Sequence, residues 1–172
     1  MHRHLILGAL LAACGTDSST TTTATAALQP STGQTTTGTA TFTDAGDGVT
    51  LVIEIASAAP GVHGMHIHQV GDCAMDGMAA GGHWDGGDTA GDPTNHGLPD
   101  ADTHHVGDLG NITIAADGTG RLTAGNDFWT LADASAMDVV GHSVIFHALT
   151  DDGTMPSAGA RAACGVILTS AP

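Results

Sequence analysis

Apolar and polar residues alternate along several short stretches of the chain. Val49, Leu51, Ile53 and Ile55 recur at every second position with other residues between them, and this period of two predicts a half-buried strand. The same kind of pattern predicts strands at 39–43, 61–69, 112–114, 121–123, 143–149 and 166–168. No segment keeps a helical period over a useful length. The sequence therefore predicts an all-β sandwich or barrel whose strands are joined by turns rich in Gly and Asp.

Residues 71–108 interrupt this alternation with a long stretch that has little strand pattern. A loop of that length inside a domain needs something to order it. Cysteine and histidine residues in and beyond this stretch provide two means of doing so. We expect a disulfide and a bound metal to hold the loop in place.

The N-terminus is typical of a secreted protein. Residues 1–13 place Arg3 before an apolar run that is too short to span a bilayer as a helix, which predicts a signal peptide. Cys14 follows Leu-Ala-Ala, which resembles a bacterial lipobox, and would become the lipidated N-terminus; an ordinary signal with an incidental Cys is the alternative. Residues 14–36 are mostly small and polar, which predicts the lipidated Cys followed by a flexible tether. The folded domain is then expected at 37–172.

This arrangement predicts an exported protein, periplasmic or at the cell surface, that meets the membrane only through its N-terminal lipid. Export leaves Cys73 and Cys164 as one cysteine pair in an oxidising compartment. The chain has 18 acidic residues against 3 Lys plus Arg, and its formal net charge is -15. Nucleic-acid binding and adhesion through a basic surface are excluded, because both need clustered Lys and Arg.

Eleven His residues instead indicate metal binding. His66 and His68 are two positions apart on a predicted strand, so they face the same side; with His83 and His147 they form a nitrogen-rich set suited to copper. A second set of three imidazoles and the carboxylate of Asp108 would suit zinc. Separate sites would need seven imidazoles, and only six are well placed. A His83 shared through both ring nitrogens resolves this shortfall; His96 and His105 complete the second set.

Six motifs in one order resemble those of the copper/zinc superoxide dismutases. They are Gly61-Val-His-Gly-Met-His66-Ile-His68 with Gly71-Asp-Cys73, Ala80-Gly-Gly-His83-Trp, Asn95-His96-Gly97, His105-Val-Gly-Asp108-Leu-Gly-Asn-Ile, Gly141-His-Ser-Val-Ile-Phe-His147 with Asp151-Asp152, and Gly159-Ala-Arg161-Ala-Ala-Cys164. The resemblance runs from about residue 37 to 168. It implies a Greek-key barrel or sandwich of about eight antiparallel strands, with long metal-binding and channel loops.

The resemblance also implies roles for individual residues. Copper would bind His66, His68, His83 and His147, and zinc would bind His83, His96, His105 and Asp108, with His83 as a bridging imidazolate. Asp151 would hold one histidine of each site, and Arg161 would attract superoxide at the mouth of the copper channel. Cys73 and Cys164 would join the long loop to the last strand. The implied reaction converts two superoxide anions to O₂ and hydrogen peroxide through alternate reduction and oxidation of copper.

Several alternatives remain open at this point. His63 is expected to have a packing role, His104 could replace His105 as a zinc ligand, and His142 stands where relatives commonly have Arg. The protein could bind copper and zinc without useful turnover, or it could be a copper-only dismutase. The acidic surface predicts weak long-range steering of superoxide, with Arg161 as the local attraction. The oligomeric state is not determined by the sequence.

Overall fold

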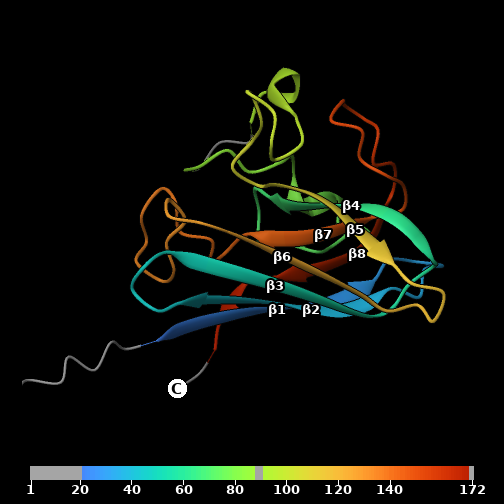
Figure 1. Ribbon diagram of the computed structural model, residues 1–172, viewed down its shortest axis with the longest axis horizontal. Helices are drawn as coiled ribbons and strands as arrows, with labels where there is room; N and C mark the ends of the chain where they lie inside the picture. Colours follow the sequence, from blue (N-terminus) through green and yellow to red (C-terminus); the bar gives the residue numbers. More distant parts are fainter. Residues whose placement is uncertain (1–20, 88–90, 171–172) are drawn as a thin grey trace, which may run out of the picture.

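Figure 1 shows the computed structural model, which describes residues 21–87 and 91–170. Nearly all regular structure in these residues is β-strand. The strands are β1 Thr22–Pro30, β2 Thr37–Asp44, β3 Val49–Ser57, β4 Gly61–His68, β5 Asp108–Ile114, β6 Gly120–Asn126, β7 Ser143–His147, β8 Arg161–Val166 and β9 Leu168–Thr169. Two three-residue 3₁₀ helices, Met78–Ala80 and Pro93–Asn95, lie in the long loop between β4 and β5. The predicted all-β fold is confirmed.

Eight of the strands form a closed antiparallel barrel. Their order is β2-β3-β6-β5-β4-β7-β8-β1, and β1 also pairs with β2, which closes the ring. The neighbours β3 and β6, β4 and β7, and β8 and β1 are not consecutive in the chain, as a Greek-key arrangement requires. The two-residue β9 pairs with β1 beside the ring. The predicted Greek-key fold of about eight strands is therefore confirmed.

The core of the barrel comes from the alternating strands. Val49, Leu51, Ile53 and Ile55 of β3 all lie inside, with at most 3% of their surface exposed. Burying a side chain of this size stabilises a fold by about 1.5–3 kcal/mol. The barrel wall is therefore a rigid support for residues that point out of it toward a site.

Strand β1 corrects the prediction of a flexible tether at residues 14–36 and of a domain that begins at residue 37. Residues Thr22–Pro30 form a barrel strand that pairs with β2 from Thr22↔Asp44 to Leu28↔Gly38. Ala24, Ala26 and Leu28 are fully buried. Sequence analysis failed here because small alanines can fill the inner face of a strand, and threonine favours β structure. The predicted signal peptide and Cys14 lie outside the described residues.

Other predicted strands also have different limits, among them β5, which begins at Asp108 and not at Ile112, and β6, which runs from Gly120 to Asn126. The expected strand at 143–149 ends at His147, and the strand expected at 166–168 instead begins at Arg161 and runs to Val166, followed by the short β9. Gly-Ala-Arg-Ala-Ala-Cys was not recognised as a strand because it lacks large apolar residues. Within the described residues, no helix has the length and apolar character needed to cross a membrane.

The long loop between β4 and β5 is fastened at several points. Cys73 forms a disulfide with Cys164 of β8, as predicted. The backbone of Trp84 donates to Ile67 O over 3.0 Å, and Gly107 N donates to Trp84 O over 2.8 Å, so the loop returns to the end of β4. Figure 1 shows this loop, in green to yellow, on the same side of the barrel as the orange-red segment that follows β7. Together these two segments enclose the candidate site.

Candidate metal centre

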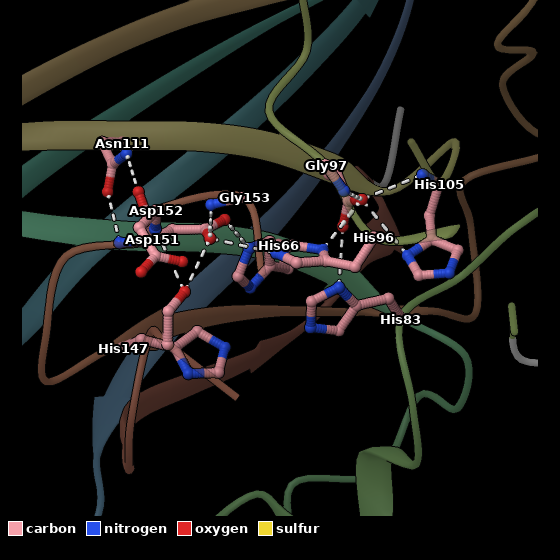
Figure 2. Close-up of polar contacts among 12 residues, drawn as sticks. His66, His83, His96, Gly97, His105, Asn111, His147, Asp151, Asp152 and Gly153 are labelled. Atoms are coloured by element: carbon pink, nitrogen blue, oxygen red, sulfur yellow. Dashed lines mark hydrogen bonds and ion pairs between the residues drawn. The ribbon is translucent and has the colours of Figure 1, made fainter. Parts of the chain in front are cut away.

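The predicted metal-binding residues come from both the barrel wall and the long loop. His66 and His68 lie on β4 and His147 lies on β7, which pairs with β4 in the register His66↔Ile145. His83, His96 and His105 come from the loop, and Asp108 is the first residue of β5. All seven are buried. Figure 2 shows the rings of His66, His83 and His96 gathered close to one another.

The first group of donors contains only imidazoles. One ring nitrogen from each of His66, His68, His83 and His147 lies within 4.8 Å of the others. Among the described residues, Nδ1 of His66, Nε2 of His68 and Nε2 of His147 are buried without a hydrogen-bond partner. Leaving buried polar atoms unpaired costs free energy. These three nitrogens, together with one ring nitrogen of His83, fit a copper ion, for which imidazole is a suitable donor.

Hydrogen bonds at the opposite ring nitrogens orient these side chains. His68 donates from Nδ1 to Gly81 O over 2.9 Å, and His147 donates from Nδ1 to Gly159 O over 3.2 Å. His66 uses Nε2 to bond Asp151 over 2.8 Å. Because each ring donates from one nitrogen, the other keeps its lone pair for a metal.

The rings of His68, His83 and His147 resist protonation. Burial, followed by the neighbouring His83, holds the pKa of His68 well below its usual value. Burial lowers the pKa of His83 to about 4, although the hydrogen bond to Asp108 opposes this. Burial and then the neighbouring His66 lower the pKa of His147 to about 3. These imidazoles are therefore neutral at neutral pH, as metal ligation requires.

The second group of donors converges on one carboxylate. Nδ1 of His83, His96 and His105 lies 2.7, 3.0 and 3.2 Å from an oxygen of Asp108. The His105 contact lacks hydrogen-bond geometry, so its buried Nδ1 has no hydrogen-bond partner among the described residues. The set of donors that lie within 4.8 Å of one another contains His66, His83, His96 and Asp108 and does not include His105. The bond of His66 to Asp151 leaves only its Nδ1, which belongs to the first group. Three imidazoles and one carboxylate fit a closed zinc site.

The carboxyl group of Asp108 is ionised at neutral pH. Burial alone would raise the pKa of its carboxyl group, but the hydrogen bond from His83 and the one from the His105 backbone lower it below its usual range. The backbone N–H groups of His105 and Gly97 donate to Oδ2 over 2.9 and 3.2 Å. The loop backbone therefore fixes this carboxylate, and the carboxylate orients the rings of His83 and His96.

His83 belongs to both groups. Its Nδ1 faces Oδ1 of Asp108 at 2.7 Å, so Nε2 is the nitrogen that remains for the first group. Its ring stacks on His66 with a centroid distance of 4.0 Å. The predicted shared position of His83 is thus compatible with the geometry; whether the ring is an imidazolate stays a prediction.

Asp151 joins the two groups, as expected. Its Oδ2 accepts from His66 over 2.8 Å, and its Oδ1 accepts from His96 over 3.0 Å. Asn111 clamps the backbone of Asp151 through two bonds of 2.8 Å, which Figure 2 shows as dashed lines. Sequence analysis had given Asn111 no role, although it lies in the motif that begins at His105.

Arg161 lies at a pocket of about 190 Å³ that opens onto the first group. Its Nη1 donates to Gly77 O, and its Nη2 donates to Gly81 O over 2.6 Å. Burial lowers the pKa of Arg161 from its usual value, but a guanidinium stays charged at neutral pH. The positive charge therefore faces the route by which a small anion would approach the imidazoles.

The structure separates these residues from the other histidines that the sequence left open. His63 packs on Phe146 and points its ring nitrogens at His147 O and Ala59 O. His104 is exposed, and its Nδ1 faces Ala101 O at 3.3 Å. His142 stacks on Trp84 and bonds Gln69 O over 2.6 Å. At the position where His104 was the alternative, His105 is the residue that reaches Asp108.

Comparisons with known proteins agree with this site. The family model described as copper/zinc superoxide dismutase (SODC) matches residues 36–167, which include all seven donor residues. Among solved structures, this chain is similar to the clock protein EA4, with a TM-score of 0.69 and 30% sequence identity. That match covers 86% of this chain and 94% of the other.

Proposed function

This chain belongs to the copper/zinc superoxide dismutase family, whose members are oxidoreductases that bind copper and zinc, and we propose that it converts two superoxide anions and two protons to O₂ and hydrogen peroxide at an imidazolate-bridged centre. The observation that carries the proposal is the convergence of buried imidazole nitrogens on two adjacent groups that share His83. Among the described residues, the donor nitrogens of His66, His68 and His147 in the first group and Nδ1 of His105 beside Asp108 have no hydrogen-bond partner. A storage site needs neither the shared ring nor an arginine at its opening.

The protein supplies the positions for this chemistry. When bound, copper provides one-electron reduction and oxidation, while zinc is redox-inactive and holds the shared ring. His66, His68 and His147 keep their donor nitrogens in place through Asp151, Gly81 O and Gly159 O. Nε2 of His83 takes up a proton in one half of the cycle and releases it to the reduced second superoxide. Nδ1 of His83 faces Asp108 and would remain available to zinc, which His83, His96, His105 and Asp108 would hold.

Arg161 attracts the substrate. The chain has a formal net charge of -15, so the long-range field opposes the approach of an anion. Surface charges act over about 8–10 Å at ordinary ionic strength, which leaves the guanidinium at the pocket as a local attraction for the anion. Turnover should therefore change little with added salt, and a steep decline would contradict this proposal.

We further propose that the protein is exported and anchored through a lipid on Cys14. The sequence of residues 1–14 supports this, and the Cys73–Cys164 disulfide is of the kind found in proteins of oxidising compartments. Metabolic labelling with palmitate tests the anchor directly. Labelling of the wild type and of a Cys14→Ser variant to the same extent would contradict it.

Metal analysis combined with a dismutation assay tests the catalytic proposal. The soluble domain should bind one copper and one zinc ion and produce peroxide from superoxide far faster than free aqueous copper. Arg161→Ala should keep both metals and lose about tenfold in rate, because one local charge near a partly desolvated site contributes roughly 1–2 kcal/mol. Full metal loading with activity no better than aqueous copper would favour the alternative, a copper- and zinc-binding lipoprotein without useful turnover.

A further inference from the structure

The turn that follows β1 is hydrogen-bonded to the long loop, whose carbonyl oxygens orient Arg161 of β8. Thr32 follows β1 by two residues and donates its backbone N–H and its Oγ1–H to Oδ1 of Asp76, over 2.8 and 2.9 Å. The next residue, Gly77, provides the carbonyl oxygen that accepts from Nη1 of Arg161. A Cβ on Gly77 would lie 3.5 Å from Cδ of Arg161, so the two residues are packed against each other. Asp76 therefore lies directly beside the group that orients the guanidinium.

These contacts close a ring around the arginine. Ser31 donates its backbone N–H to Ala162 O over 3.0 Å, and Ala162 directly follows Arg161. The ring consists of Arg161, Gly77, Asp76, Thr32, Ser31 and Ala162. It borders a small cavity of about 90 Å³ that is also lined by the Cys73–Cys164 disulfide. The turn after β1 is thus connected to the site opening on two sides, through β8 and through the long loop.

The loop backbone at Asp76 needs such support. Met75 and Asp76 have φ angles of 53° and 56°, and Gly77 has 79°. The left-handed region is unfavourable for residues with a Cβ, although Asp tolerates it better than most. A backbone of this kind persists only when surrounding contacts hold it. The two bonds from Thr32 are contacts of this type, and they act on the residue next to Gly77.

We propose that Asp76 is a positioning residue for the anion-binding arginine: bonded to Thr32, it fixes the Gly77 carbonyl and, through that carbonyl, the guanidinium of Arg161. The inference rests on the proposed function, because the position of Arg161 matters only if an anion binds in the pocket. It gives the N-terminal strand a part in substrate capture.

An effect of Asp76 through its charge and an effect through positioning of Arg161 predict opposite changes in anion binding when Asp76 is replaced. The bonds from Thr32 lower the pKa of Asp76 below its usual value, so the side chain is an anion at neutral pH. If its charge were all that mattered, removing it would strengthen the binding of another anion nearby. If it positions Arg161, removing the acceptor oxygen weakens anion binding despite the loss of negative charge.

Two substitutions separate these effects in the copper- and zinc-loaded full chain. Asp76→Asn removes the charge and keeps an oxygen that accepts from Thr32, whereas Asp76→Ala removes both. Azide is the probe, and its affinity is read from the absorbance of the azide complex of Cu(II). We expect Asp76→Ala to bind azide about threefold more weakly than Asp76→Asn, a ratio typical of one lost hydrogen bond. Equal or tighter binding by Asp76→Ala would overturn the inference.

Thr32 provides a matched pair without any change of charge. Thr32→Val removes the hydroxyl donor and should weaken azide binding about twofold, while Thr32→Ser keeps the donor and should bind like the wild type. Equal affinities for Val and Ser would also count against the inference. In the metal-free chain, the Arg161 guanidinium N–H signals in NMR should exchange faster with water in Asp76→Ala than in Asp76→Asn. Unchanged exchange would show that Asp76 does not hold the arginine.

The behaviour of the wild type distinguishes failure of the proposed function from failure of the role proposed for Asp76. If it takes up copper and zinc but neither binds azide nor dismutates superoxide, the proposed function fails, and the inference fails with it. If the wild type does both and the Asp76 variants behave alike, only the inference is wrong. Circular dichroism and a thiol assay confirm that each variant is folded with its disulfide intact.

Discussion

The two halves of the metal centre rest on different supports. Three of the four imidazoles predicted to bind copper lie on β4 and β7, which pair along their length from Met65↔Phe146 to His68↔Ser143. On the zinc side, His83, His96 and His105 come from the long loop, and only Asp108 begins a strand. The barrel wall therefore positions most of the copper side, whereas the zinc side depends on contacts that its own residues make.

This difference predicts how each half responds to damage. The strand histidines lie on a closed barrel with a fully apolar core, so losing one should leave its neighbours in place. The loop histidines meet at the Asp108 carboxylate, to which each contributes a ring nitrogen. Removing one shared contact there should loosen several residues at once. The zinc side should thus be the first part of the centre to lose order.

Removing the disulfide should give the largest effect. Cys73 and Cys164 are 91 residues apart, and closing a loop of that size is worth about 4 kcal/mol in the chain-entropy model. The double variant Cys73→Ser/Cys164→Ser should lose about that much unfolding free energy in denaturant. Hydrogen exchange should rise in residues 73–87 and 91–107 well before it rises in β3. Uniform loosening of loop and barrel would remove the distinction between the two halves.

Asp108 and His147 offer a direct contrast between loop and strand. Asp108→Ala should cost about 3 kcal/mol in the metal-free chain, because it removes hydrogen bonds to a buried charged group, and it should abolish zinc binding. His147→Ala should lower copper affinity and leave proteolytic resistance of residues 91–107 unchanged. Limited proteolysis with metal analysis reads both effects. If His147→Ala exposed the loop as much as Asp108→Ala did, the strand would not be the more independent support.

The donor residues could be named from the sequence because the information is local. His66 and His68 share a strand face by period two, and motif order supplied the remaining donors and Asp108. The strand containing Val49 and Ile53 was equally readable, since large apolar residues alternate there. The fold class and the clustering of these side chains were therefore predictable from the sequence, and which metal each group binds stays a prediction.

Other features were hidden because they depend on backbone groups or small side chains. Backbone carbonyl oxygens orient three side chains of the site: Gly77 O accepts from Arg161, Gly81 O from His68 and Gly159 O from His147. The residue type does not reveal such acceptors, because every residue has a backbone carbonyl. Strand β1 was missed because Ala24 and Ala26 offer little apolar surface, although both are fully buried. Only the packed barrel shows that small residues are required there.

Acid should destabilise the metal-free chain through a buried histidine in the long loop and one on the barrel wall. The pKa of His83 in the loop is lowered to about 4 and that of His147 on β7 to about 3, against about 6.5 when unfolded. Below pH 6.5 the unfolded chain takes up protons that the folded chain refuses, so stability falls as pH falls. Between pH 7 and 5.5 these two rings should together cost about 2.5 kcal/mol.

Denaturant titrations across this pH range test the prediction. His83→Gln and His147→Gln should each reduce the slope of stability against pH. A stability that rises toward pH 5.5 would contradict the burial of neutral rings. If only the His83 substitution changed the slope of stability against pH, the His147 ring would be protonated in the folded chain. The loop and the barrel wall would then differ more than expected.

The smallest effect is expected on the outer wall of the barrel, where Arg121 of β6 pairs with Glu54 of β3. Their side chains are 58% and 67% exposed, and exposed pairs of this kind contribute less than about 0.5 kcal/mol. Arg121→Gln should therefore change neither the unfolding free energy nor azide affinity measurably, although it removes one of the two cations in the described residues. Glu54→Gln and the double variant complete a cycle that isolates the pair. A clear loss of azide affinity in Arg121→Gln would mean that distant charge steers anions after all, and that the strand wall contributes more to the site than a rigid support.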